Sequence, residues 1–253
     1  MLNIHETDKK VAFDEPSHTY TFEGKLISRS VTTFIAQFFE SFESELIAHR
    51  MITGKNWPRP GYIKECGTPY TKEEILAQWT YIGETASNRG TWMHYNIERY
   101  LNGLSTSVDI PELEQFMNFH QDVIVSREFK PFRTEWRIVA PDLDLAGSVD
   151  LVVQKMDGSY AIIDWKRSKN LPTKMTDSYG KKGKPPISHL PDCDGSKYFL
   201  QQNIYKYILE KYYDINITEM LLVSMHPEFD KYFLVDVPDL GRETLSLMEH
   251  LAS

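Results

Sequence analysis

The chain has 253 residues, of which 41% are hydrophobic and 25% charged, and its formal net charge is −8. These values suit an ordinary globular chain with one domain, or with one core and an elaborated end, and they exclude a disordered or fibrous protein. The acidic balance argues against a protein that coats nucleic acid unspecifically, because that mode of binding needs a basic surface. Apolar runs are far shorter than the roughly 20 residues of a membrane helix, and residues 1–10 resemble neither a secretory signal nor a transit peptide. We therefore expect an intracellular protein, in the cytoplasm or in a host cell.

The first half of the chain predicts a hairpin followed by helices. Residues 17–24 alternate and end in a glycine, which is typical of a strand that enters a hairpin. Ser30 can cap a helix whose apolar stripe runs from Phe34 to Phe42. After a loop rich in Pro and Gly at 56–69, a capping box from Thr71 to Glu74 opens another helix. Further helices are expected over the ranges 85–101 and 112–126.

The second half predicts an antiparallel meander of strands over 133–139, 145–153 and 160–166. A helix over 197–213, strands over 219–224 and 232–237, and a closing helix from residue 239 follow. The expected fold is α/β, a mixed sheet flanked by helices in a single domain. Within it, residues 1–126 form a mainly helical elaboration and residues 127–253 form the α/β core.

The turn between the last two strands of the meander predicts their register. Gly158 accepts the left-handed conformation that a three-residue hairpin loop requires, so Lys155 pairs with Ser159. In that register Asp150 faces Asp164, with Cβ atoms about 5 Å apart. Alternation then assigns one face to Ser148, Asp150, Asp164 and Lys166, and the opposite face, which includes Val149, Leu151 and Trp165, to the core.

Two facing carboxylates repel each other unless one is protonated or a cation lies between them. Magnesium and manganese take oxygen ligands of this kind and keep positions free for water and phosphate. Lys166 can assist either as a base or by stabilising negative charge, and both roles are open. The plainer interpretation of Asp164 and Lys166 is a surface ion pair. The apolar residues that frame both aspartates argue against it, because charges inside apolar strands need a reason.

Several motifs in sequence order resemble the RecB-like branch of the PD-(D/E)XK nuclease superfamily, and in particular the mitochondrial genome maintenance exonuclease group with its viral and phage relatives. They are Gly90–His94, Gly147–Asp150, Asp164–Lys166 and Gln201–Tyr205. The resemblance implies a restriction-endonuclease-like core that binds Mg²⁺ or Mn²⁺. The implied metal ligands are His94, Asp150, Asp164 and the main-chain carbonyl of Trp165, and the implied catalytic residues are Asp150, Asp164, Lys166, Gln201 and Tyr205. The chain has only two cysteines, Cys66 and Cys193, so we expect no iron–sulfur cluster.

Further residues are candidates for the site or for DNA contacts. Glu98, one helical turn after His94, is either structural or orients that histidine. Glu135 either points to the site or pairs with Arg133 or Arg137 at the surface. A basic stretch from Lys166 to Lys184 is either a DNA-binding rim or a solvated loop. The candidate DNA contacts are Arg89, Ser148, Arg167, Ser168, Lys169, Lys181 and Lys182.

The expected function is that of a metal-dependent DNA exonuclease acting on single-stranded or frayed ends in replication, recombination or repair. One alternative is a structure-selective or site-specific DNA endonuclease, because the same core serves both. An alternative from another class is a nucleic-acid-binding module without catalysis, although such a module gains nothing from the carboxylate pair. The expected partner is DNA, and no membrane is involved.

Overall fold

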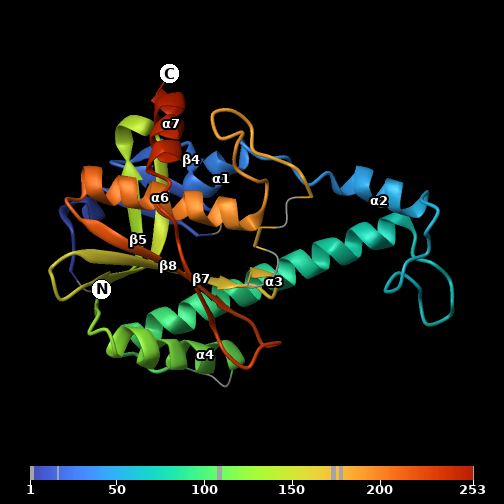
Figure 1. Ribbon diagram of the computed structural model, residues 1–253, viewed down its shortest axis with the longest axis horizontal. Coiled ribbons are helices and arrows are strands. Elements are labelled where there is room, and N and C mark those ends of the chain that lie inside the picture. The colour runs from blue at the N-terminus through green and yellow to red at the C-terminus, as the bar shows by residue number, and fades with distance from the viewer. Residues whose placement is uncertain (1–2, 16, 107–109, 172–174, 177–178, 253) are drawn as a thin grey trace. The chain divides into compact units, whose positions relative to one another are not determined.

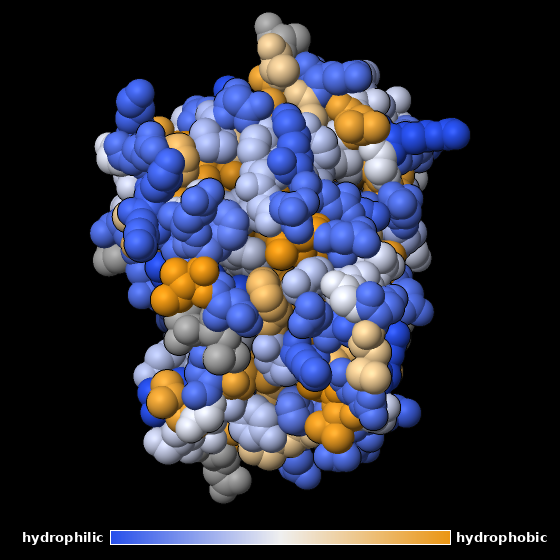
Figure 2. All heavy atoms as spheres, turned by 90° about the vertical axis from the view of Figure 1, so that its left-hand side faces the viewer, coloured by the Kyte–Doolittle hydropathy of each residue, from blue (hydrophilic) through white to orange (hydrophobic). Residues whose placement is uncertain are grey.

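The computed structural model describes residues 3–15, 17–106, 110–171, 175–176 and 179–252. The chain forms two compact units, one made of residues up to 40 together with residues from 93 onward, the other of residues 41–92. The predicted single domain stays a prediction. Among the described residues, no helix combines the length and apolar character needed to cross a bilayer. Figure 2 shows one face of the molecule, on which hydrophilic side chains predominate and hydrophobic ones lie in small separate groups.

The N-terminal segment forms a small antiparallel sheet. After a 3₁₀ turn at Glu6–Lys9, the strands are β1 (Val11–Asp14), β2 (Thr19–Phe22) and β3 (Lys25–Ile27). The β2–β3 pair confirms the predicted hairpin. Strand β4 (Arg29–Ser30) leads into helix α1 (Val31–Ala36), which Ser30 caps by accepting a hydrogen bond from the main-chain NH of Thr33 at 3.1 Å. Helix α1 ends before the predicted apolar stripe does, yet Phe38 and Phe39 are buried beyond it.

The second unit contains helix α2 (Ser44–Ile52) and most of helix α3 (Lys72–Leu101). The predicted capping box is present, since Thr71 and Glu74 exchange hydrogen bonds of 2.8 and 3.3 Å. The prediction of two separate helices between residues 71 and 101 was wrong, because α3 runs unbroken for 30 residues. No proline interrupts this range, and each of its glycines, Gly83 and Gly90, costs a helix only about 1 kcal/mol relative to alanine.

A mixed sheet of six strands forms the core of the first unit (Figure 1). Before it, helix α4 (Pro111–Phe119) continues into a π-helical turn at His120–Val125. The remaining elements are β5 (Lys130–Ala140), a 3₁₀ turn (Pro141–Leu143), β6 (Leu145–Gln154), β7 (Tyr160–Arg167), α6 (Asp194–Tyr212), β8 (Ile217–Met225), β9 (Phe233–Asp236) and α7 (Gly241–Ala252). The strand order is β4-β6-β7-β8-β9, with β5 also paired to β6. The antiparallel β5–β6–β7 meander and the parallel β7–β8 pair confirm the predicted mixed sheet.

The register of the β6–β7 hairpin is the predicted one. Lys155 donates its main-chain NH to the carbonyl of Ser159 at 2.8 Å, and the ladder continues to Leu151 opposite Ile163. Gly158 adopts the required positive φ of 84°. The predicted opposition of Asp150 and Asp164 lies one step beyond the last ladder pair and stays a prediction.

The prediction that only one face of this hairpin is buried was wrong, because helices cover both faces of the sheet. Val152 and Ile162 pack with residues of α1, α6 and α7, whereas Leu151, Ile163 and Trp165 pack with α4 and the end of α3. Val149 also departs from the predicted alternation, since it belongs to the first cluster and not to that of Leu151. Strict alternation along β6 is therefore interrupted next to Asp150.

Candidate active site

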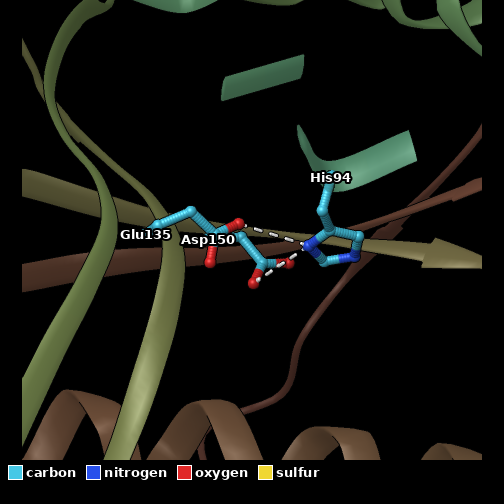
Figure 3. Close-up of side chains that lie close together, drawn as sticks. All are labelled: His94, Glu135 and Asp150. Carbon is cyan, nitrogen blue, oxygen red and sulfur yellow. Dashed lines mark hydrogen bonds and ion pairs between the residues drawn. The ribbon is translucent and has the colours of Figure 1, made fainter. Parts of the chain in front are cut away.

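Three side chains from three elements converge beside the centre of the large sheet. His94 comes from α3, Glu135 from β5 and Asp150 from β6 (Figure 3). His94 Nδ1 lies 3.3 Å from Glu135 Oε1 and 3.6 Å from Asp150 Oδ1. One nitrogen and two carboxylate oxygens of this group all lie within 4.8 Å of one another. The three residues therefore have the spacing of a metal-ligand set.

Hydrogen bonds from neighbouring strands orient the two carboxylates. Ser148 donates its hydroxyl to Glu135 Oε2 at 3.3 Å, and Trp165 donates its main-chain NH to Asp150 Oδ2 at 2.8 Å. Each carboxylate thus has one oxygen held by the protein and the other next to His94. The hydroxyl of Ser148 donates to Glu135, and its predicted role as a DNA contact stays a prediction.

Glu135 reaches the site because the main chain of β5 changes its side-chain alternation at this residue. Its φ is +44°, an uncommon value for a residue with a side chain. On one side of it, Thr134 accepts a hydrogen bond from Asn102 at the end of α3. On the other side, Trp136 packs into the cluster beneath α6. In a regular strand Thr134 and Trp136 would lie on the same face, whereas here they lie on opposite faces. Sequence periodicity alone therefore did not decide where the Glu135 side chain points.

Lys166 lies close to Asp164 and to helix α6. Its Nζ atom is 2.7 Å from Asp164 Oδ2 and donates to Gln201 Oε1 at 3.4 Å. Gln201 in turn donates its amide to the Tyr205 hydroxyl at 2.9 Å. The structure therefore joins the predicted catalytic residues Asp164, Lys166, Gln201 and Tyr205 in one connected network.

Tyr205 packs directly over Gly147, at the start of the Gly147–Asp150 motif. A Cβ atom at Gly147 would lie 2.5 Å from Tyr205 Cε1, closer than real contacts allow. The glycine is therefore required by the close approach of the tyrosine ring, and its main-chain conformation does not demand it.

Burial and mutual charge shift the pKa values of these groups. Burial raises the pKa of Asp150, and it raises that of Asp164 to about 6 despite the nearby Lys166 ammonium. Burial opposes charging of His94, but Asp150 and Glu135 outweigh it and raise its pKa to about 9. Burial also opposes charging of Lys166, yet the two aspartates raise its pKa. A cation among these carboxylates would relieve their desolvation and repulsion.

The donor set fits a divalent ion. One imidazole nitrogen and two carboxylate oxygens suit magnesium or manganese, which keep further positions for water and phosphate oxygens. Asp164 does not belong to this group and is paired with Lys166 instead. Its predicted role as a ligand, and that of the Trp165 carbonyl, stay predictions.

The remaining predicted residues are more scattered. Glu98 follows His94 on α3, but among the described contacts its carboxylate makes no hydrogen bond or ion pair with that ring. Arg167 donates to Glu112 at 2.6 Å, and both side chains are largely buried, so the structure does not support Arg167 as a phosphate contact. Lys169 and Lys181 are exposed and form surface pairs with Glu228 and Glu40 at 3.2 and 2.7 Å.

Among the described residues, three further candidate DNA contacts form no side-chain ion pair. Lys182 is exposed and forms an isolated antiparallel β-bridge with Pro191. Ser168 is half-buried, and its carbonyl accepts a hydrogen bond from Ser224. Arg89 is exposed on the part of α3 that belongs to the second unit. Part of the predicted basic stretch, including Lys174, lies outside the described residues.

A mixed sheet that presents an aspartate on one strand and an Asp-x-Lys pair on the next is the arrangement expected of the PD-(D/E)XK nuclease fold. Residues 109–211 match the sequence model of the PD-(D/E)XK nuclease superfamily. This segment contains Asp150, Asp164, Lys166, Gln201 and Tyr205. The segment that carries these residues therefore matches the PD-(D/E)XK nuclease superfamily, the family that the sequence motifs predicted.

The solved structures that the chain matches show low sequence identity and low TM-scores. The chain is 13% identical to an alkaline exonuclease from Laribacter hongkongensis, covering 87% of this chain and 89% of that one, with a TM-score of 0.35. It is 10% identical to a phage-related exonuclease from Haemophilus somnus 129PT, covering 86% and 92%, with a TM-score of 0.32. It is 15% identical to SSO0001, with a TM-score of 0.27, covering 55% of this chain and only 58% of that one. No curated protein matches the chain.

Proposed function

We propose that the protein is a metal-dependent DNA exonuclease that hydrolyses phosphodiester bonds at single-stranded or frayed ends during replication, recombination or repair. One observation carries this proposal. The ligand set of His94, Glu135 and Asp150 lies beside the Asp164–Lys166 pair, within a core of the PD-(D/E)XK superfamily.

The site residues divide into two functional groups. His94, Glu135 and Asp150 would hold Mg²⁺ or Mn²⁺, with Asp164 as a further candidate ligand. Such an ion, when bound, polarises a phosphoryl oxygen and lowers the pKa of water. Lys166 supplies the second function. Because the neighbouring aspartates favour its ammonium form, we assign it to stabilising negative charge on the phosphate and not to accepting a proton.

DNA binding by an acidic chain requires local positive charge. Lys169, Lys181 and Lys182 are exposed. The surface ion pairs of Lys169 and Lys181 are weak enough for phosphates to compete with the carboxylates. The preference for free or single-stranded ends rests on the resemblance, so it needs its own test.

The experiment compares linear and circular DNA, both single- and double-stranded, with end labels on the linear forms. Reactions contain Mg²⁺, Mn²⁺ or a chelator. The variants are Asp164→Asn and Lys166→Met, and the matched controls are Asp230→Asn and Lys25→Met, two exposed residues outside the site. We expect metal-dependent loss of linear strands, slowed at least about 100-fold by both site variants and unchanged by both controls.

The substrates distinguish the alternatives. If circular DNA stays intact while linear DNA is degraded, the result supports an exonuclease. If circular DNA is cut, the protein is an endonuclease. Binding of DNA without cleavage under either metal would instead support the binding module and overturn the proposed catalysis.

A further inference from the structure

The proposed function leaves open how the flexible side chain of Lys166 is held at the reacting phosphate. Lysine has four rotatable side-chain bonds and loses considerable freedom when its ammonium is fixed. Asp164 and Gln201 contact the ammonium at 2.7 and 3.4 Å. A third neighbour is Tyr198, because Lys166 Nζ lies 5.0 Å from the centre of its ring.

Tyr198 shares one face of α6 with the predicted Gln201–Tyr205 element. Residues three and four apart lie on the same side of a helix, so Tyr198, Gln201 and Tyr205 form a continuous row. The row begins with the Tyr198 ring next to the ammonium, continues with the Gln201 carbonyl that accepts from it, and ends at the Tyr205 hydroxyl. Tyr198 therefore extends the network by one turn towards the start of α6.

We propose that Tyr198 is a positioning residue for Lys166, its ring face holding the ammonium beside Asp164 and Gln201. This inference rests on the proposed function, because it assigns Lys166 to the chemical step. The ring acts through its π-electrons, which attract a cation lying over the face. The hydroxyl is not required for this contact.

The same helix offers a matched control. Lys211 Nζ lies over the ring of Tyr207 at 5.4 Å, and Tyr207 is partly buried against the same hydrophobic cluster as Tyr198. Tyr207→Leu therefore removes a lysine–tyrosine ring contact from α6, together with the 3.1 Å hydrogen bond from Lys211 Nζ to the Tyr207 hydroxyl, at a site away from Lys166. A general effect of weakening α6 would appear in both Tyr198→Leu and Tyr207→Leu.

The first measurement is steady-state cleavage of end-labelled DNA by Tyr198→Phe, Tyr198→Leu and Tyr207→Leu. We expect Tyr198→Phe and Tyr207→Leu to match the unaltered chain. Tyr198→Leu should lower kcat about five- to tenfold with little change in KM, the size that a partly desolvated cation–π contact implies. A rise in KM at constant kcat would show that Tyr198 contacts DNA and would overturn the proposal, as would equal loss in Tyr198→Phe.

The second measurement does not need activity. In protein labelled with ¹³C at the lysine ε-carbons, the ring current of Tyr198 should shift the Lys166 ε-protons upfield, with Lys166→Met providing the assignment. Tyr198→Leu should abolish this shift, and Tyr198→Phe should keep it. If the shift is lost in Tyr198→Leu but the unaltered protein never cleaves DNA, the positioning of Lys166 is supported and the proposed nuclease activity is refuted. An unchanged Lys166 signal in Tyr198→Leu would refute the positioning even in an active enzyme.

Discussion

The main-chain NH of Trp165 donates a hydrogen bond to Oδ2 of Asp150 at 2.8 Å. This bond ties a candidate metal ligand on β6 to the main chain of β7 between Asp164 and Lys166. The Trp165 indole is itself held edge-to-face by Phe116 and Phe119 of α4, with ring centroids 5.4 and 5.6 Å away. Packing on one face of the sheet therefore positions the polar groups of the site.

Glu135 should contribute more to metal affinity than Asp164. Glu135 lies within the ligand group, whereas Asp164 is paired with Lys166. We expect Glu135→Gln to weaken Mn²⁺ binding at least tenfold and Asp164→Asn to weaken it less. Isothermal titration calorimetry on the DNA-free protein measures both. The opposite order would assign Asp164 as the principal ligand and Glu135 to an orienting role.

Ser148→Ala should loosen the Glu135 carboxylate, because it removes the 3.3 Å hydrogen bond to Oε2. We expect about a tenfold loss of Mn²⁺ affinity. The free energy of unfolding should change by only about 1 kcal/mol. Ser17→Ala is the control, since Ser17 also donates to a carboxylate, that of Asp14, at an exposed position. Equal Mn²⁺ affinity in Ser148→Ala and the unaltered chain would rule out the orienting role.

Gly147→Ala should disturb both stability and activity, because the added Cβ would overlap the Tyr205 ring. Such overpacking costs about 1–3 kcal/mol. Gly83→Ala is the control, since no atom lies within 4 Å of its Cβ position in α3, and it should stabilise the chain by about 0.5–1 kcal/mol. Urea unfolding of both variants, and of Gly147→Ala combined with Tyr205→Leu, gives the double-mutant cycle. If Gly147→Ala lowers the free energy of unfolding as much in the Tyr205→Leu background as in the unaltered chain, the steric explanation is wrong.

Asp8 should stabilise the fold in a pH-dependent way. Burial alone would raise its pKa, but the guanidinium of Arg133 at 2.6 Å and the main-chain NH of His5 together lower it below 3.8. The folded state then binds a proton more weakly than the unfolded state. The stabilisation is present above pH 3.8 and is lost as the pH falls through the lower folded value.

Asp8→Asn should therefore lower the free energy of unfolding by about 2 kcal/mol at pH 7, and the difference should shrink below pH 4. Urea unfolding between pH 3 and pH 7 measures this, with the exposed neighbour Glu6→Gln as the control. A difference that is independent of pH would mean that the effect of Asp8 is not electrostatic.

Local sequence patterns predicted the β6–β7 hairpin and its register as far as Leu151 opposite Ile163. A hairpin turn and the alternation next to it are set by nearby residues, so such features can be predicted from a short stretch. The same holds for the Ser30 and Thr71 caps, in which each hydrogen bond joins residues three apart. The continuity of α3 was missed because isolated glycines weaken a helix without ending it.

By itself, the sequence predicted the mixed α/β fold, the match of residues 109–211 to the PD-(D/E)XK superfamily and a set of candidate site residues. The tertiary structure decided which of them meet. Glu135 joins His94 and Asp150 only because β5 changes its alternation at a positive φ. Arg167 is directed to Glu112, 55 residues earlier in the chain. Such contacts depend on how distant elements pack, and no local periodicity encodes that packing.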